Sequence, residues 1–61
     1  MVYVDYRYYR KRDNKFVDAT MEFDRVNKAI RFIHGLHSRG YQYLGFSCDS
    51  YDELEDMESK I

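Results

Sequence analysis

One stretch, DRVNKAIRFIHGLHSRG at residues 24–40, combines a start signal, an amphipathic repeat and a stop signal for a helix. Asp24 suits the N-cap, and Gly40 suits the left-handed conformation that ends many helices. Gly35, in the middle, costs roughly 1 kcal/mol relative to Ala, which indicates close packing of another backbone against it. The apolar residues recur three or four positions apart, as on one face of a helix: Val26, Ala29, Ile30, Ile33 and Leu36. We therefore predict a helix whose apolar face is covered by another element.

Two stretches before this helix alternate apolar and polar residues, as half-buried β-strands do. Between them, KRDNK at residues 11–15 predicts a turn, because Asp13 and Asn14 tolerate left-handed backbone angles. A hairpin of residues 2–10 and 16–22 is expected. The side chains expected to face the core are Val2, Val4, Tyr6 and Tyr8 in the first strand, and Val17, Ala19 and Met21 in the second.

The remaining chain predicts a third strand and a short second helix. In the strand, YQYLGFSC at residues 41–48, alternation turns Leu44, Phe46 and Cys48 inward and turns Tyr41, Tyr43 and Gly45 outward. Gly45 is also a candidate position for a β-bulge. Ser50 and Glu53 match the S-x-x-E capping box. This box predicts a helix with Leu54, Met57 and Ile61 along its apolar edge.

The order of elements is β-β-α-β-α, and it predicts a single small α+β domain over residues 1–61. The simplest three-stranded sheet has the order 2-1-3, with the first strand antiparallel to both neighbours, the long helix on one face and the other face open. A sheet with the second and third strands adjacent would divide the faces in the same way. With one cysteine, Cys48, no disulfide can form within the chain.

Charge and hydropathy place the protein among cytoplasmic chains without a membrane segment. No apolar run reaches the roughly 18 residues of a membrane-spanning helix, and MVYVDYRYYRKR lacks the apolar core of a signal peptide. The net charge of −1 hides an uneven distribution. Residues 1–39 carry nine Lys and Arg against five Asp and Glu, whereas residues 40–61 carry one against six. Either half can therefore attract a charged partner.

The open sheet face is the candidate functional surface. Seven Tyr and four Phe are more aromatic residues than the core of a 61-residue chain readily accommodates. The strand alternation places an aromatic set on the open face, edged by the basic turn. The predicted partner-binding residues are Tyr3, Arg7, Tyr9, Phe16, Tyr41, Tyr43, Arg10, Lys11 and Arg12. A one-residue slip of register would exchange the two faces of a strand and remove its residues from this surface.

Such a surface suits either protein or single-stranded nucleic acid. Tyrosine is common at protein interfaces because it combines a large area with a polar tip. Aromatic platforms beside basic residues also stack unpaired bases. An isoelectric point near 6.0 favours protein, because nucleic-acid binders are usually basic. We therefore expect a regulatory module that binds a protein partner or a second copy of itself, with nucleic-acid binding as the alternative.

The sequence contains no recognisable catalytic or metal-binding pattern, and we expect a non-enzymatic protein without a cofactor. His34 and His37 share one helix face, but with Cys48 they lack the spacing of a zinc site. Cys48 is better interpreted as a partly buried thiol than as a nucleophile. The six carboxylates from Asp49 to Glu58 could imitate a phosphate backbone, yet a solvated helix face is the preferred interpretation.

Overall fold

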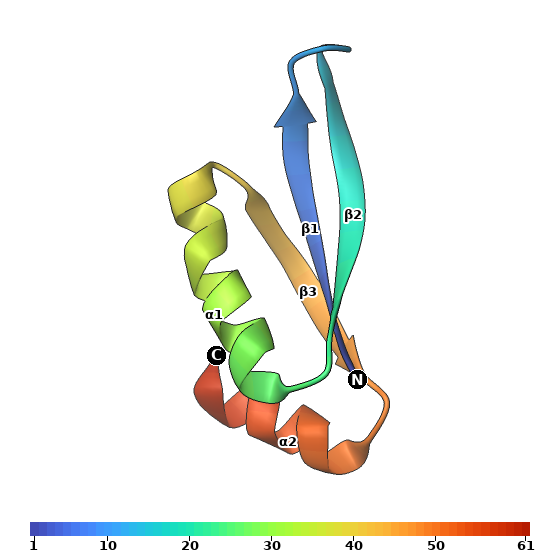
Figure 1. Cartoon of the computed structure of the whole chain (residues 1–61), viewed down its shortest axis with the longest axis vertical. Helices are drawn as coiled ribbons and strands as arrows, with labels where there is room; N and C mark the ends of the chain where they lie inside the picture. Colours follow the sequence, from blue (N-terminus) through green and yellow to red (C-terminus); the bar gives the residue numbers. More distant parts are fainter.

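A computed structural model describes residues 1–61 and has the expected α+β architecture (Figure 1). The predicted β-β-α-β-α order is confirmed, and so is the sheet order β2-β1-β3, with β1 antiparallel to both neighbours. A short 3₁₀ turn continues the long helix. The elements are β1 (Val2–Arg10), β2 (Lys15–Phe23), α1 (Val26–Leu36), the 3₁₀ turn η1 (His37–Arg39), β3 (Gln42–Cys48) and α2 (Tyr51–Lys60).

The β1–β2 hairpin forms where the sequence predicts it. Its register runs without interruption from Val2 opposite Phe23 to Arg10 opposite Lys15. The chain reverses through residues 11–14, where Asn14 has a φ of 53° and so adopts the left-handed conformation that asparagine tolerates. The four-residue turn therefore fixes the register of the hairpin.

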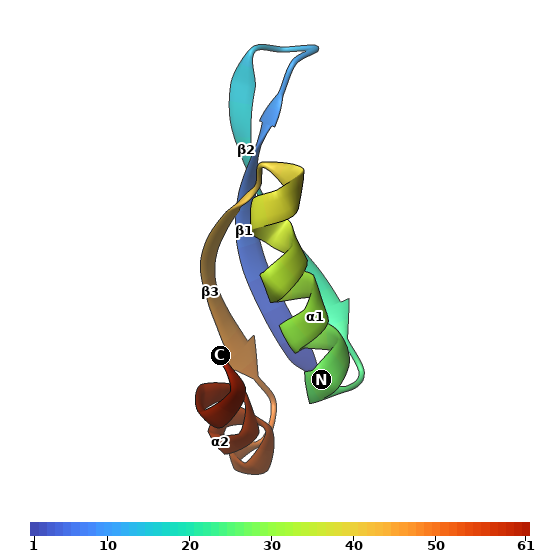
Figure 2. The ribbon, with the colours of Figure 1, turned by 90° about the vertical axis from the view of Figure 1, so that its left-hand side faces the viewer.

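The core lies between the sheet and α1, which covers one sheet face (Figure 2). Its buried side chains come from the first strand and from both helices. They are Val2, Val4, Val26, Ala29, Leu36 and Met57. Ile30 and Ile33 pack against this cluster and are partly buried, so the predicted apolar face of α1 is confirmed. Because Met57 is fully buried, α2 also contributes to the core, whereas Ile61 is exposed.

The two ends of α1 differ in how well the sequence predicts them. The expected Asp24 cap is wrong, because α1 begins at Val26 after Arg25 and no side chain caps it. Asp24 instead pairs with Lys28 at 3.0 Å, and this contact lowers the pKa of Asp24. At the other end Gly40 has the predicted left-handed conformation, with a φ of 76°. Its N–H donates to the carbonyl of His37 at 3.0 Å, which closes the turn after the helix.

Gly35 does not have the structural role that the sequence suggests. The sequence predicts close packing of another backbone there, but apart from the helix's own neighbouring backbone no atom lies within 4 Å of the position that a Cβ would occupy. The expectation is therefore wrong. Gly35 adds flexibility to the helix without relieving any steric conflict.

A β-bulge in β3 overturns part of the predicted sheet surface. Pairing with β1 is regular from Cys48 to Gly45, but Tyr6 then lies opposite Tyr43, so Leu44 is the extra residue. An inserted residue reverses the alternation of every side chain before it. Phe46 and Cys48 therefore face the helix as predicted. Tyr43 also lies on the helix side, and Leu44 is 41% exposed rather than inward.

The molecule is elongated because the β1–β2 hairpin extends past the end of β3 and of α1. Its extents are 39 × 20 × 15 Å. β3 begins at Gln42 opposite Arg7, so beyond this point β1 and β2 continue as a two-stranded ribbon (Figures 1 and 2). We call residues 8–17 the distal hairpin. The remaining chain, with all three strands and both helices, is the basal half.

Candidate interaction surface on the distal hairpin

Four of the predicted surface residues share the open sheet face, but they separate into two groups. The cross-strand pairing places Tyr3, Arg7, Tyr9 and Phe16 on the side opposite the core. Tyr3 lies at the basal end of β1, and its hydroxyl donates to Asp49 Oδ2 at 2.9 Å. This hydrogen bond raises the pKa of Tyr3. Tyr3 is therefore engaged within the chain, while the other three lie toward the distal hairpin.

Tyr9 and Phe16 form an exposed aromatic pair on the distal hairpin. They are direct cross-strand partners, and their rings meet edge to face with 5.3 Å between centroids. The Tyr9 hydroxyl donates to Asn14 Oδ1 at 2.8 Å, which ties the ring to the turn. Phe16 is 72% exposed and Tyr9 46%. The pair is thus an apolar surface that no other element covers.

Cationic side chains are frequent near this pair, on both faces of the hairpin and in its turn, and carboxylates within the chain already hold most of them. Arg7 donates to Asp18 through Nε at 2.7 Å and through Nη2 at 3.3 Å. The contact raises the pKa of Arg7 and lowers that of Asp18. Arg10 and Arg12 both form ion pairs with Asp13. Lys11 and Lys15 are the cationic residues of this region that have no ion-pair partner.

A hollow of about 320 Å³ lies beside the aromatic pair, next to the point where β3 stops pairing with β1. It brings together both strands of the hairpin and the corner between η1 and β3. The lining residues are Arg7, Tyr8, Tyr9, Phe16, His37, Gly40, Tyr41 and Gln42. The sequence missed the contribution of Tyr8, which strand alternation assigns to the core. Tyr8 lies past Arg7, where pairing with β3 ends, so only β2 flanks β1 there.

Two predicted surface residues, Tyr41 and Tyr43, are not on the open face. Tyr41 lies just before β3, stacked on Tyr6 with 5.7 Å between ring centroids and against Tyr8 at 5.4 Å. Tyr43 packs against the core, and burial raises its pKa. The bulge at Leu44 is the physical reason. Gly45 was the sequence signal that could have found it.

Arg10 also faces away from the predicted surface. It pairs with Lys15 in the register that places Val2 and Val4 against the helix, so it shares the helix side of the hairpin. Lys11 and Arg12 lie in the turn itself. The surface that the structure assembles is therefore smaller than the sequence indicates, and it is concentrated at one end of the molecule.

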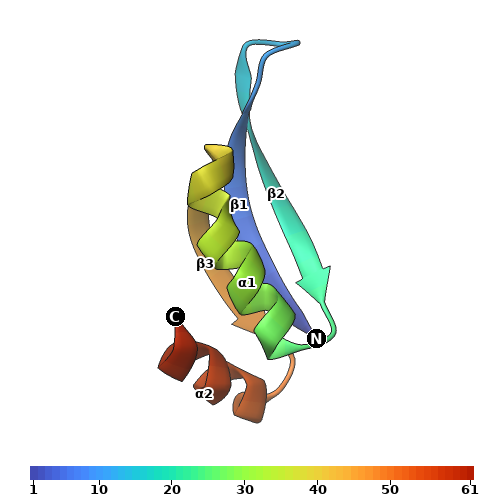
Figure 3. The ribbon, with the colours of Figure 1, turned by 60° about the vertical axis from the view of Figure 1, so that its left-hand side comes forward.

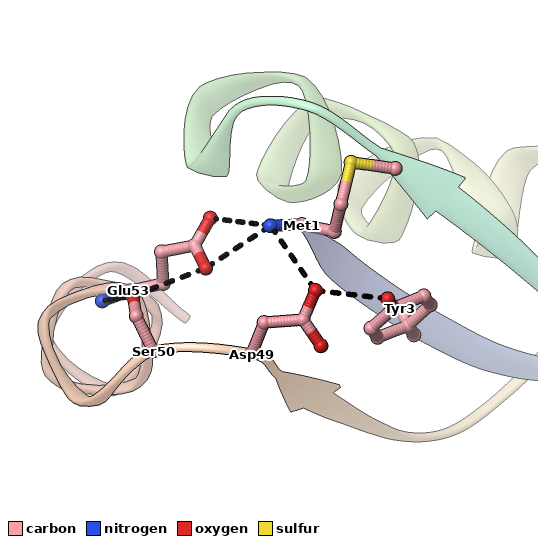
Figure 4. Close-up of polar contacts among 5 residues, drawn as sticks. All are labelled: Met1, Tyr3, Asp49, Ser50 and Glu53. Atoms are coloured by element: carbon pink, nitrogen blue, oxygen red, sulfur yellow. Dashed lines mark hydrogen bonds and ion pairs between the residues drawn. The ribbon is translucent and has the colours of Figure 1, made fainter.

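The opposite end carries the acidic residues in a hydrogen-bonded network (Figure 4). Ser50 Oγ accepts from the backbone N–H of Glu53 at 3.2 Å, as the capping box predicts. The Glu53 carboxylate accepts from the amino group of Met1 at 3.1 and 3.2 Å. This contact raises the pKa of the amino group. The start of α2 is thereby joined to the start of β1.

The remaining sequence candidates do not form a second site. His34 and His37 are exposed on α1 and η1, and no group of three or more His, Cys, Asp or Glu side chains is arranged to hold a metal ion. Cys48 is partly buried against the core, as predicted, and burial raises the pKa of its thiol. Neither α1 nor α2 has the length and apolar run needed to cross a bilayer.

Comparison with known proteins leaves the site to be interpreted from its own chemistry. No protein family, no curated protein and no solved structure was found to match the chain.

Proposed function

We propose that this chain is a non-enzymatic protein-interaction module and that the distal hairpin is its binding element. The observation that carries the proposal is the Tyr9–Phe16 pair, in which Phe16 is 72% exposed beside a hollow of about 320 Å³. A large side chain exposed at the end of a projecting ribbon is typical of an anchor that enters a pocket on another protein. The Asn14 contact holds Tyr9 in place before binding, which reduces the entropy lost on association.

The charges around the pair favour an acidic partner surface. Residues 7–18 contain five Lys and Arg against two Asp, and Lys11 and Lys15 have no ion-pair partner. Such a rim attracts carboxylates and speeds association without needing buried ion pairs. We therefore assign the partner an apolar pocket for Phe16 that is bordered by Asp and Glu.

Single-stranded nucleic acid is the less favoured ligand, for a reason visible in the ion pairs. Affinity for nucleic acid depends mainly on cations that are free to meet phosphates. Arg7 is held by Asp18, and Arg10 and Arg12 by Asp13. Tyr9 and Phe16 also meet edge to face, and this arrangement does not offer two parallel ring faces for successive bases.

The test is site-specific crosslinking followed by affinity measurement. A photoreactive phenylalanine analogue replaces Phe16, and the chain is irradiated in nuclease-treated lysate of its own cells. The same analogue at Tyr51 is the matched control, because Tyr51 is equally exposed, at 72%, but belongs to α2. We expect one protein to crosslink from position 16 and not from position 51. Phe16→Ala should then weaken binding of that purified protein by at least about thirtyfold.

Two results would contradict the proposal. One is equal crosslinking from both positions, which would indicate nonspecific contact. The other is binding of a single-stranded oligonucleotide that falls steeply with salt and is lost in Phe16→Ala. This result would show that the same surface binds nucleic acid instead of protein.

A further inference from the structure

The outer edge of β2 is a long strand edge that nothing in the chain covers. β2 ends the sheet on one side, and its nine residues pair with β1 without a bulge. No turn, loop or side-chain hydrogen bond reaches the backbone of residues 16–22 from elsewhere in the chain. Its outward N–H and C=O groups are therefore free to pair with another strand. Proteins protect such an edge with charged side chains, a proline, a bulge or a covering segment. β2 carries Lys15, Asp18 and Glu22 but has no proline, bulge or covering segment.

The other edge of the sheet has the protection that β2 lacks. β3 is shorter, with seven residues, and the bulge at Leu44 and Gly45 interrupts it. A bulge bends the strand and disturbs the regular spacing of its hydrogen-bonding groups. Strand addition is therefore favoured at β2 and disfavoured at β3.

An uncovered apolar strip accompanies the free edge of β2. Val17, Ala19 and Met21 point to the helix side, yet none of them packs against the core cluster, and Met21 is 41% exposed. The reason is the lateral position of α1, which runs along β1 and leaves most of β2 standing clear (Figures 1 and 3). A partner at this edge would thus gain backbone hydrogen bonds and apolar contacts together.

We propose that the partner at this edge is a second copy of the chain, with the two β2 strands antiparallel about a two-fold axis through Ala19. A two-fold axis perpendicular to the sheet is the symmetry that pairs identical antiparallel edge strands with both helices on the same side. All nine residues of β2 pair in this register, and displacement of the axis in either direction pairs fewer.

Charge selects the same register. With the axis at Asp18, the two Asp18 carboxylates would face each other, and with the axis at Thr20, each Asp18 would face Glu22 of the other copy. Like charges in directly opposed positions destabilise a sheet. With the axis at Ala19, Asp18 faces Thr20 instead, and no like charges are directly opposed.

The apolar strip is self-complementary in this arrangement. Val17 of each copy lies opposite Met21 of the other, and the two Ala19 residues meet at the axis. The six side chains form one continuous apolar patch on the helix side of a doubled sheet. The two distal hairpins then point in opposite directions, so the dimer presents an interaction surface at each end.

Sedimentation or light scattering from micromolar to millimolar concentration provides the test. We expect a mass that approaches twice the 7.5 kDa of one chain as concentration rises. Ala19→Lys and Ala19→Glu each place like charges opposite each other at the axis, and each should weaken the dimer at least about tenfold. A mixture of the two variants should restore association, because Lys then faces Glu. Circular dichroism verifies that both variants remain folded.

Matched variants separate this dimer from other modes of association. Ser47→Lys adds the same charge to an exposed position on β3 and should leave the dimer intact. Tyr9→Ala, on β1 and away from the β2 edge, should also leave it intact, so loss of the distal aromatic pair and loss of the dimer are read independently. A monomer at millimolar concentration, a dimer that survives Ala19→Lys, or no association in the mixture would overturn the proposal.

Discussion

The basal half and the distal hairpin use the same two strands for different purposes. In the basal half, β1 is flanked on both sides and covered by α1, so Val2 and Val4 are completely buried. In the distal hairpin the same strand has lost β3 as a neighbour, and Tyr9 is 46% exposed. Along β1 the residues change accordingly, from Val2 and Val4 in the basal half to tyrosine and arginine in the distal hairpin. Stability is concentrated in the first region and the candidate binding surface in the second.

This difference shows how a small chain can separate folding from binding. A 61-residue chain has an expected stability of roughly 3–9 kcal/mol, so it cannot lose much core without unfolding. A surface built on a projecting ribbon can change with little effect on the core, because no residue of the distal hairpin belongs to the buried cluster. Besides the two strands themselves, the aromatic contacts of Tyr8 with Tyr6 and Tyr41 join the two regions.

The largest expected effect comes from truncating the core. Leu36 is 1% exposed, and Leu36→Ala should lower the free energy of unfolding by about 2–5 kcal/mol because it leaves a cavity. Phe16→Ala in the distal hairpin removes one cross-strand aromatic contact and should lower it by no more than about 1 kcal/mol. Urea unfolding of both variants measures the contrast. Equal losses would show that the two regions are not energetically distinct.

An intermediate effect is expected where the two regions meet. Tyr41→Ala removes the aromatic contacts with Tyr6 and Tyr8 and should cost about 1–3 kcal/mol, less than a fully buried aromatic because Tyr41 is only half-buried. Tyr51→Ala, at an exposed position of α2, is the control and should cost no more than about 0.5 kcal/mol. Thermal or urea unfolding distinguishes them. If Tyr41→Ala lowers the free energy of unfolding as little as the control does, the contacts of Tyr41 with Tyr6 and Tyr8 do not stabilise the protein, and its placement on the open face would be favoured.

The smallest predicted effect is a gain within the basal half. Gly35→Ala should stabilise the protein by about 0.5–1 kcal/mol, because alanine restricts the unfolded chain and no atom lies near the added methyl group. The distal hairpin should retain its partner affinity, since Gly35 does not line the hollow. A decrease in stability would show that α1 approaches a neighbour more closely than the structure indicates.

Local patterns were sufficient for most of the fold. The two-residue alternation of β1 and β2, the Asn14 turn and the apolar stripe of α1 are each encoded within a short stretch, and each was predictable. The 2-1-3 order was the simpler of the two that connectivity allows, and the structure selects it. The Asp24 cap failed because a nearby lysine competes for the same carboxylate. Propensity identifies residues that suit a position, but it does not identify the partner that each one takes.

The candidate surface was only partly predictable, because a face depends on the pairing of strands. Tyr9 and Phe16 were placed correctly, since the hairpin turn alone fixes their register. Tyr41 and Tyr43 were misplaced by the single extra residue at Leu44. A glycine in a strand suggests that a bulge is possible. Where the extra residue falls is decided only when β1 and β3 are side by side.

The amino-acid sequence alone is enough to predict which elements form and in what order. It also predicts that aromatic and basic side chains are left at the surface once the core is filled. These properties depend on periodicity and turn chemistry, which act over a few residues. The tertiary structure alone decided that β3 stops opposite Arg7 and that α1 leaves most of β2 uncovered. Both outcomes depend on how elements distant in sequence fit together. The distal hairpin and the free edge of β2, on which the two proposals rest, are products of that fit.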